Sequence, residues 1–309
     1  MHYAIIGAGN IGSLYGANLA RTGNDVTLID INQEHIDAIA RDGLHMTGLH
    51  GEFTADVAAT TDPSTVSNVD VAIVCVNGYA TEAAANTAKS VLKPDGYALS
   101  LQNGLGNLEV LEATLGNGRA LGGITFHSAD LQAPGRVEHT NHGPTYIGEL
   151  DKQRTQRVEQ LASDLERAEM DPHIEPDIMR TIWGKFVHNC GLNAICAITD
   201  LRPGYIRDVP ELDEFQTQII EETLALVTAK GIQLEDPDPI TLIKDYSASK
   251  FHRVSMTQHL DRGMRTEIDS LNGYVARESL HHGLTAPAND ALTKLMKGRE
   301  YLPKSKPPA

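Results

Sequence analysis

Three glycines directly after the first apolar segment place the strongest constraint on how this chain can fold. The run Gly7-Ala8-Gly9-Asn10-Ile11-Gly12 matches the pattern G-x-G-x-x-G. It follows an expected strand at residues 2–6 and opens an expected helix at 10–22. In that context the first glycine permits a tight turn, the second lets a ligand approach the backbone, and the third lets helix and strand pack closely.

This β-turn-α unit predicts a dinucleotide site, because a helix N-terminus offers free amides and a positive dipole end to a pyrophosphate. We assign the cofactor contacts here to Gly7, Ala8, Gly9, Asn10, Ile11 and Gly12. The next strand, at 25–30, ends on Asp30. A carboxylate at that position can accept hydrogen bonds from ribose hydroxyls and repels a 2′-phosphate. No Lys or Arg occurs in residues 31–33, so the sequence favours NAD(H) over NADP(H). A helix-capping role for Asp30 is the alternative, and it does not exclude the ribose contact.

The first half of the chain alternates strand and helix patterns, which predicts a parallel sheet with right-handed crossovers. A nearly continuous apolar strand is expected at 69–76, a helix at 80–92, a turn at Pro94–Gly96 and a strand at 97–101. A helix is expected at about 33–41, and a polar, Gly-containing stretch follows it to about residue 60. Segments 120–126, 135–139 and 145–148 are expected to extend the sheet with antiparallel edges, followed by a helix at 152–169.

Beyond residue 178 nearly every pattern is helical, and the longest segment is expected at 210–230. We therefore predict an α/β fold: an N-terminal Rossmann-type doubly wound sheet in residues 1–175, followed by an all-helical domain in 176–300 that binds substrate. The Pro- and Lys-rich tail 301–309 is expected to be disordered.

Charge and hydropathy limit the classes of partner that this chain is expected to bind. The 309 residues carry a formal charge of −15, which argues against nucleic-acid and anionic-lipid partners. No run of 18 apolar residues occurs, which argues against a membrane span. The N-terminus lacks the basic region of a signal peptide, and the three cysteines show no metal spacing, so we expect a cytoplasmic protein without a metal site. The oligomeric state is left open, with a homodimer as one alternative.

Polar side chains recur at intervals of four within an otherwise apolar helical segment. Lys185, Asn189 and Asn193 share one helix face, drifting about 40° per step. Polar groups in a packed helix are costly unless something polar lies opposite, and a bound substrate would satisfy them. The alternative is a lysine that extends to solvent and asparagines that bond to nearby backbone. A second group contains Ser255 and Glu267; Glu267 taken alone is more readily a solvated or ion-paired glutamate.

Taken together, five motifs resemble the ketopantoate reductase family along nearly the whole chain. They are Gly7–Gly12, Leu101–Asn107, Pro134–Val137, Lys185-x3-Asn189-Cys190-x2-Asn193, and Arg265-Thr266-Glu267-Ile268-Asp269-x2-Asn272-Gly273. The resemblance implies a Rossmann domain followed by a helical domain, with the active site between them. It also implies reduction of a 2-keto acid to a D-2-hydroxy acid, foremost 2-dehydropantoate to (R)-pantoate.

The same resemblance implies roles for individual side chains. Lys185 would be the general acid, Asn103 would lie near the nicotinamide and this lysine, and Glu267 would contact the substrate hydroxyl or the lysine. Asn189 and Asn193 would bind substrate polar groups and Ser255 the substrate carboxylate. Where relatives carry a lysine after the strand that ends at Val76, this chain has Asn77, which we assign to the cofactor site.

Three alternatives stay open at this stage. The substitution at Asn77 and the Asp30 carboxylate both fit an NAD-dependent D-2-hydroxyacid dehydrogenase of the mandelate or branched-chain type on the same scaffold. A non-catalytic NAD-sensing protein is the alternative from another class, although such a protein has no need of a proton donor. An opine- or hydroxyacyl-type dehydrogenase would use a His–Glu pair, and its nearest histidine, His188, lies beside rather than on the face of Lys185.

Overall fold

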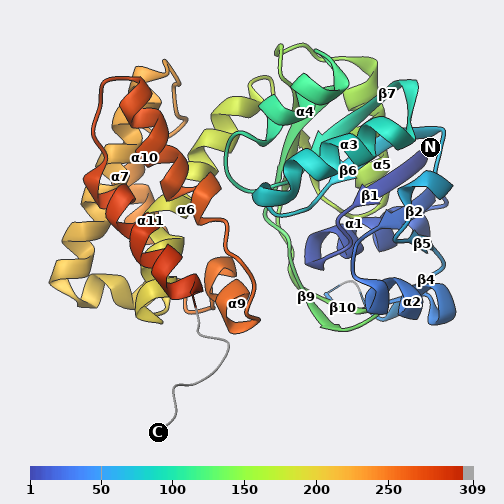
Figure 1. The fold of residues 1–309 in the computed structure, drawn as a ribbon, viewed down its shortest axis with the longest axis horizontal. Helices are drawn as coiled ribbons and strands as arrows, with labels where there is room; N and C mark the ends of the chain where they lie inside the picture. The colour runs from blue at the N-terminus through green and yellow to red at the C-terminus, as the bar shows by residue number, and fades with distance from the viewer. Residues whose placement is uncertain (50, 302–309) are drawn as a thin grey trace, which may run out of the picture. The chain divides into compact units, whose positions relative to one another are not determined.

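The computed structural model describes residues 1–49 and 51–301. They form two compact units, Met1–Met179 and the chain from Arg180 onward. In Figure 1 the first unit runs from blue through green, and the second from yellow to red. The division lies four residues after the boundary at 175 that the sequence suggests. Apart from Tyr301, which is exposed, the expected disordered tail lies outside the described residues.

An eight-stranded sheet forms the centre of the first unit. In spatial order it runs β12-β11-β8-β7-β6-β1-β2-β5. The strands are β1 (His2–Ile6), β2 (Asp25–Ile29), β5 (Ala58–Thr60), β6 (Val69–Val74), β7 (Leu92–Ser100), β8 (Ala120–Thr125), β11 (Thr145–Glu149) and β12 (Pro172–Ile174). The six from β5 to β8 are parallel. Their order reverses between β1 and β6, which is the switch point of a doubly wound sheet, so the predicted Rossmann-type fold is confirmed.

Helices cover this sheet because its central strands are apolar on both sides. Ile5 in β1 and Ile73 in β6 are fully buried. The helices are α1 (Asn10–Arg21), α2 (Gln33–Asp42), α3 (Thr81–Val91), α4 (Asn107–Leu115) and α5 (Gln156–Arg167), with short 3-10 turns η1 (Pro63–Thr65) and η2 (Gly78–Ala80). α1 contacts α5 while α3 contacts α4 (Figure 1). Right-handed crossovers on either side of the switch point place these two pairs on opposite faces.

Two local expectations are wrong. Pro94–Gly96 is not a free turn but an irregular part of β7, whose pairing jumps from Leu92 opposite Val69 to Tyr97 opposite Val71. Segment 135–139 does not extend the main sheet as an antiparallel edge. Instead β10 (Arg136–Asn141) pairs in parallel with β3 (Leu44–Gly48) and antiparallel with β9 (Ser128–Ala133).

Together with β4 (Phe53–Ala55), these three strands form a separate four-stranded sheet, and β3 and β4 lie in the polar, Gly-containing stretch before residue 60. The helix α1 contacts strands of both sheets. The first turn of α1 is also tied to the small sheet, since the Leu131 amide donates to Oδ1 of Asn10 at 3.0 Å. The small sheet therefore supports the helix that follows the glycine motif.

Helices joined by loops make up the second unit in its described part, residues 180–301, which contains no strand. Its elements are α6 (Ile178–Thr199), η3 (Pro203–Asp208), α7 (Pro210–Ala229), α8 (Pro239–Ala248), α9 (Ser255–Asp261), η4 (Ile268–Ser270), α10 (Asn272–His281) and α11 (Pro287–Glu300). A buried polar network joins four of these helices. Asn272 donates to the Cys190 carbonyl on α6 and to Asn289 on α11, and Asn289 donates to Glu222 on α7.

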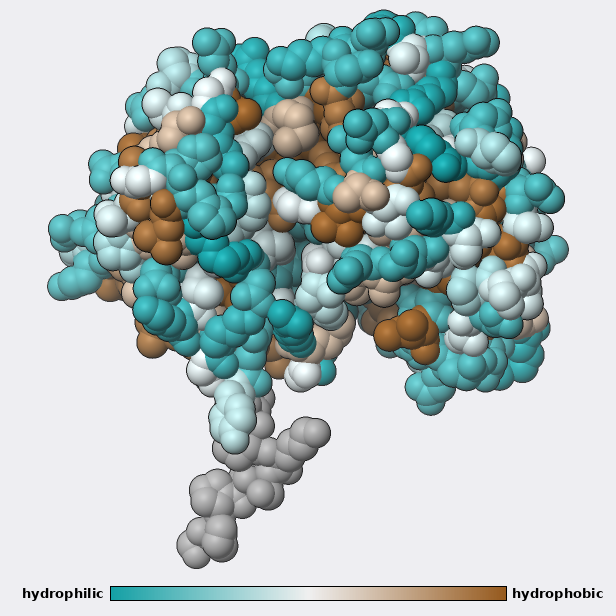
Figure 2. Space-filling model, turned by 45° about the horizontal axis from the view of Figure 1, so that its top comes forward, coloured by the Kyte–Doolittle hydropathy of each residue, from teal (hydrophilic) through white to brown (hydrophobic). Residues whose placement is uncertain are grey.

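The surface agrees with the high charge of the sequence. Figure 2 shows hydrophilic residues over most of the face in view, with apolar residues in scattered patches. In residues 1–49 and 51–301, no helix is both long and apolar enough to cross a membrane.

Candidate active site

The glycine motif has the geometry that its spacing predicts. Gly7 has φ of +96°, and a Cβ on it would lie 2.8 Å from the amide nitrogen of Val76. A Cβ on Gly12 would lie 1.9 Å from the carbonyl oxygen of Gly7, so helix α1 and strand β1 are in direct backbone contact there. A Cβ on Gly9 would meet no protein atom within 4 Å. Two glycines are thus required by the fold, while the space beside the third is open.

Four assigned residues follow the carboxyl ends of neighbouring parallel strands. Gly7 follows β1, Asp30 follows β2, Asn77 comes shortly after β6, and Asn103 comes shortly after β7. In doubly wound sheets, ligands bind at this edge, beside the switch point. The strand order therefore brings cofactor candidates from four separate stretches of sequence to one edge of the sheet.

Hydrogen bonds between side chains and loops fix this edge. Gln102 donates to the Val76 carbonyl at 3.0 Å and to the Thr81 hydroxyl at 2.8 Å, which joins the loops after β6 and β7. Asn107 accepts from Thr81 at 2.8 Å and donates to the Asn103 carbonyl at 3.0 Å. No individual role was predicted from the sequence for Gln102, Thr81 or Asn107. Gln102 and Asn107 belong to the Leu101–Asn107 motif, and the only signal for Thr81 was a polar residue in the first turn of an expected helix.

The Asp30 carboxylate accepts the Asn32 amide at 2.8 Å. It does not cap the following helix, because Asn32 is the N-cap of α2 and accepts the His35 amide. His35 lies within electrostatic reach of Asp30, but burial lowers the pKa of its imidazole below the usual value. The residues after Asp30 therefore bring no fixed positive charge to it.

His35 also holds the glycine motif in place through a chain of hydrogen bonds. Its Nδ1 accepts the Gly135 amide at 2.9 Å, so the neutral ring carries its proton on Nε2. That nitrogen lies 3.2 Å from the Ser13 hydroxyl, which donates to the Ala8 carbonyl at 2.8 Å. This chain of bonds connects the small-sheet loop at Gly135 to the motif, and it requires an uncharged imidazole.

The predicted polar face of the second unit lies on α6, a helix of 22 residues. Lys185 and Asn189 are half-buried, and Asn193 is buried with 7% of its surface exposed. Trp183, Phe186 and Val187, which flank Lys185 on the helix, are buried apolar residues. The polar side chains therefore line one face of a largely apolar helix.

Lys185 and Glu267 interact electrostatically. Burial lowers the pKa of the Lys185 ammonium to about 8, and the negative charge of Glu267 opposes that shift. Glu267 precedes η4 and is buried, with 6% of its surface exposed. Of the two interpretations of Glu267 from the sequence, the solvated glutamate is thus wrong. The ion-paired glutamate agrees with the effect of its charge on Lys185.

Three candidates from the sequence remain: Ser255, Asn103 and His188. Ser255 is exposed at the first residue of α9, and its contact with a substrate carboxylate stays a prediction. Asn103 belongs to the first unit, and its approach to Lys185 stays a prediction as well. Burial and the Lys185 charge lower the pKa of His188 to about 4. Its ring packs at a right angle against Tyr246, with centroids 4.7 Å apart, so His188 is a neutral packing residue rather than a general base.

Comparison with known proteins places this geometry in a family. Residues 3–152 match the family model "Ketopantoate reductase PanE/ApbA", and residues 177–300 match "Ketopantoate reductase PanE/ApbA C terminal". The chain is 36% identical to a 2-dehydropantoate 2-reductase of Pyrococcus horikoshii, over 98% of both chains. It is 30% identical to one of Halobacterium salinarum, over 96% of this chain and 98% of the relative.

Solved structures agree with this assignment over the same length. A PanE/ApbA family ketopantoate reductase from Ralstonia eutropha superposes with a TM-score of 0.90 at 31% identity, covering 97% of this chain and 98% of that one. A D-mandelate dehydrogenase with NADH and anilino(oxo)acetate gives the same TM-score and coverage at 27% identity. The chain belongs to the ketopantoate reductase family of oxidoreductases.

Proposed function

We propose that this protein reduces 2-dehydropantoate to (R)-pantoate with a nicotinamide dinucleotide, and that Lys185 is its general acid. The observation that carries the proposal is the lysine on a polar helix face, with a pKa near 8 beside the buried Glu267 carboxylate. Such a group is protonated at neutral pH yet gives up its proton easily, which suits a general acid. Family membership and relatives named for this reaction support it.

The first unit fits the cofactor. The open space beside Gly9 admits a pyrophosphate close to the backbone, and the α1 N-terminus supplies amide donors in a chain whose charge of −15 would otherwise repel it. Gly7, Ala8, Gly9, Asn10, Ile11 and Gly12 would hold the pyrophosphate, and Asp30 the adenosine ribose. Asn77 and Asn103 would lie along the nicotinamide half, at the ends of β6 and β7. When bound, the nicotinamide supplies the hydride.

The helical unit supplies the other requirements of the reaction. As the ketone carbon is reduced, negative charge develops on its oxygen, and the Lys185 ammonium stabilises that charge and transfers a proton from Nζ to it. Glu267 keeps the lysine charged in its half-buried position. Asn189, Asn193 and Ser255 offer neutral hydrogen-bond donors to the carboxylate and the remaining hydroxyl of the substrate.

The choice of substrate rests on the number of polar groups. A carboxylate and a ketone leave part of the Lys185, Asn189, Asn193, Ser255 and Glu267 set unused, and the 4-hydroxyl of 2-dehydropantoate would occupy it. A site built to bond a hydroxyl rejects analogues that lack one, since its own buried groups are then left unpaired. The second candidate is a D-2-hydroxyacid dehydrogenase, favoured by the likeness to the D-mandelate dehydrogenase.

We also propose that NADH is preferred over NADPH. Asp30 follows the strand before α2, the first turn of α2 adds the acidic Glu34, and burial lowers the pKa of the His35 imidazole. A 2′-phosphate would meet repulsion there without a cation to offset it. Asp30→Ala should reduce the discrimination between the two cofactors, whereas Asp37→Ala, a charge change farther along α2, should not. A higher kcat/KM with NADPH than with NADH in the wild-type enzyme would overturn the preference.

The deciding experiment compares three keto acids under NADH. We expect 2-dehydropantoate to have the largest kcat/KM, well above 2-ketoisovalerate, which lacks the hydroxyl, and phenylglyoxylate, which is aromatic. If either of the last two has the larger kcat/KM, the dehydrogenase alternative replaces the pantoate assignment. If none is turned over with either cofactor, the proposed reduction is wrong.

A cytoplasmic location, the absence of nucleic-acid partners and the homodimer remain predictions from the sequence.

A further inference from the structure

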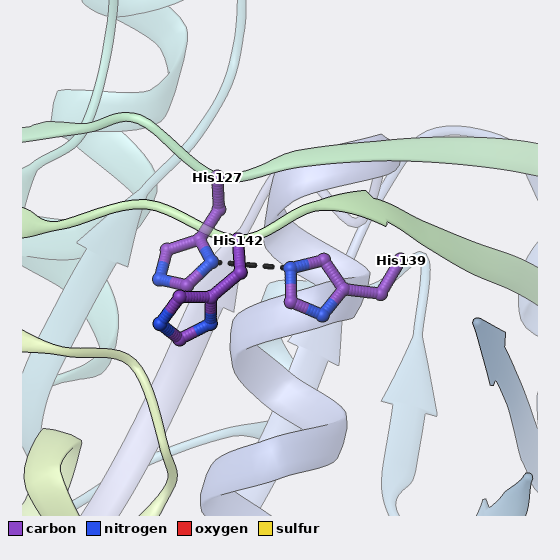
Figure 3. A group of neighbouring side chains, drawn as sticks. All are labelled: His127, His139 and His142. Atoms are coloured by element: carbon purple, nitrogen blue, oxygen red, sulfur yellow. Dashed lines mark hydrogen bonds between the residues drawn. The ribbon is translucent and has the colours of Figure 1, made fainter. Parts of the chain in front are cut away.

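Three histidines gather in the first unit, outside the glycine motif and the α6 face. His127 follows β8, His139 lies in β10, and His142 comes just after β10 (Figure 3). One ring nitrogen from each lies within 4.8 Å of the other two. His127 and His139 are buried and His142 is exposed. Imidazole nitrogens so arranged are the ligand set that late first-row transition ions prefer.

The distances suit a tetrahedral ion. Bonds of about 2.05 Å to zinc put neighbouring ligand nitrogens roughly 3.3 Å apart. Nδ1 of His127 and Nε2 of His139 are already 3.1 Å apart, so the spacing of these two nitrogens fits, and the rings must turn until both nitrogens point at one ion. The third nitrogen must close at most about 1.5 Å, from 4.8 Å. It belongs to the one exposed histidine, on the segment beyond the end of β10, where such a shift is least restricted.

The outer contact of His127 orients its ring for this role. Nε2 of His127 lies 3.2 Å from the Met170 carbonyl oxygen, and only a protonated nitrogen can bond there. The proton of neutral His127 is therefore on Nε2, which leaves Nδ1 with its lone pair toward the cluster. A metal-bound histidine usually donates its other N–H to a carbonyl in the same way. For His139, Nε2 lies 2.9 Å from the Asn141 carbonyl oxygen, so the neutral ring carries its proton there. Binding an ion through Nε2 would break that bond and move the proton to Nδ1, the other neutral tautomer.

We propose that His127, His139 and His142 form a binding site for a divalent transition ion of the zinc type. A fourth position would be taken by water, as is common where the protein supplies three ligands. The ion would link the end of β8 to the end of β10 and, through Met170, to the segment before β12. His127 also packs edge-on against Tyr15 of α1, with centroids 6.1 Å apart. The bound ion would thus stabilise the small sheet against the helix that follows the glycine motif.

Zinc binding to untagged full-length protein, stripped with a chelator, tests the proposal. Calorimetric titration with Zn²⁺ should give about one site per chain, and the unfolding temperature should rise with zinc concentration. Mg²⁺, which prefers oxygen ligands, should do neither. Cobalt should give the visible absorption bands of a tetrahedral ion with nitrogen ligands.

Two matched variants make the test specific. His142→Gln removes the exposed ligand, so it should fold and unfold like wild type without zinc. It should bind zinc at least about tenfold more weakly, since loss of a mere outer-shell contact already costs that much. His282→Gln, at an exposed histidine that ends α10, should bind zinc like wild type. Wild-type protein that binds no zinc, or binding that both variants leave equal, would overturn the proposal.

Discussion

The pKa of Lys185 predicts how the reaction rate depends on pH. With a pKa of about 8, roughly nine-tenths of the lysine is protonated at pH 7 and one-tenth at pH 9. Keto-acid reduction requires the protonated form, so kcat/KM, which reports the free enzyme, should fall about tenfold between these values. An unshifted lysine, with a pKa near 10.4, would leave the rate nearly flat over the same range.

Three variants separate this mechanism from a general effect of pH on the protein. Lys185→Ala should lower kcat by about 10²–10⁴ and change NADH binding little. Lys185→Arg keeps a charge at all accessible pH values, so its residual activity should lose the fall above pH 8. Glu267→Gln removes the charge that raises the lysine pKa, so the fall should move to lower pH.

The assay is steady-state oxidation of NADH, followed from pH 6 to 10 under saturating and limiting keto acid. Oxidation of the hydroxy acid provides an internal control, because it needs the neutral lysine and should rise through the range where reduction falls. The reasoning is refuted if Lys185→Ala keeps near-normal kcat. It is also refuted if Glu267→Gln leaves the pH profile where it was while lowering kcat.

Four further predictions concern stability and binding. Gly12→Ala drives a methyl group into the Gly7 carbonyl and should cost about 3 kcal/mol or more. Gly9→Ala should leave the unfolding free energy within about 0.5 kcal/mol but weaken NADH binding, which thermal unfolding and fluorescence titration separate. Asn289→Ala should lower the unfolding free energy by about 1–3 kcal/mol in urea, because it breaks the buried network with a carboxylate on α7. His188 has a folded pKa near 4, so the unfolded chain binds more protons below about pH 6.5. Stability should therefore fall from pH 6.5 toward 4, and the fall should be smaller in His188→Gln.

Features that depend only on residues close together in the chain could be predicted from the sequence. The glycine motif is local, since Gly7, Gly9 and Gly12 act within a single turn. The polar face of α6 depends only on helical periodicity, so the spacing of Lys185 and Asn193 predicted that they share it. The alternation of strand and helix predicted the parallel sheet, because crossover handedness leaves few topologies open.

Features that depend on contacts between residues far apart in the chain could not be predicted from the sequence. Residues 135–139 show a strand pattern, but nothing in it tells whether the strand joins the main sheet or pairs with β3, about 90 residues earlier. The Pro94–Gly96 sequence signals a turn, yet tertiary pairing holds it within β7. Burial of Glu267 was missed for the same reason. A lone glutamate is normally solvated, and only the packing around η4 reveals that this one is not.

The charge balance of the site leads to one last prediction. Lys185 and Glu267 carry one positive and one negative charge at neutral pH, so the bound substrate carboxylate adds a negative charge in surroundings that screen it poorly. A negative charge nearby favours the ammonium, so the lysine pKa should be higher in the substrate complex than in the free enzyme. The profile of kcat/KM reports the free enzyme, whereas that of kcat reports the complex. The fall in kcat/KM should therefore centre near pH 8 and the fall in kcat at a higher pH. In Ser255→Ala the gap should narrow if Ser255 holds that carboxylate near the lysine. Coincident profiles for the wild-type enzyme would show that the substrate carboxylate binds too far from Lys185 to affect it.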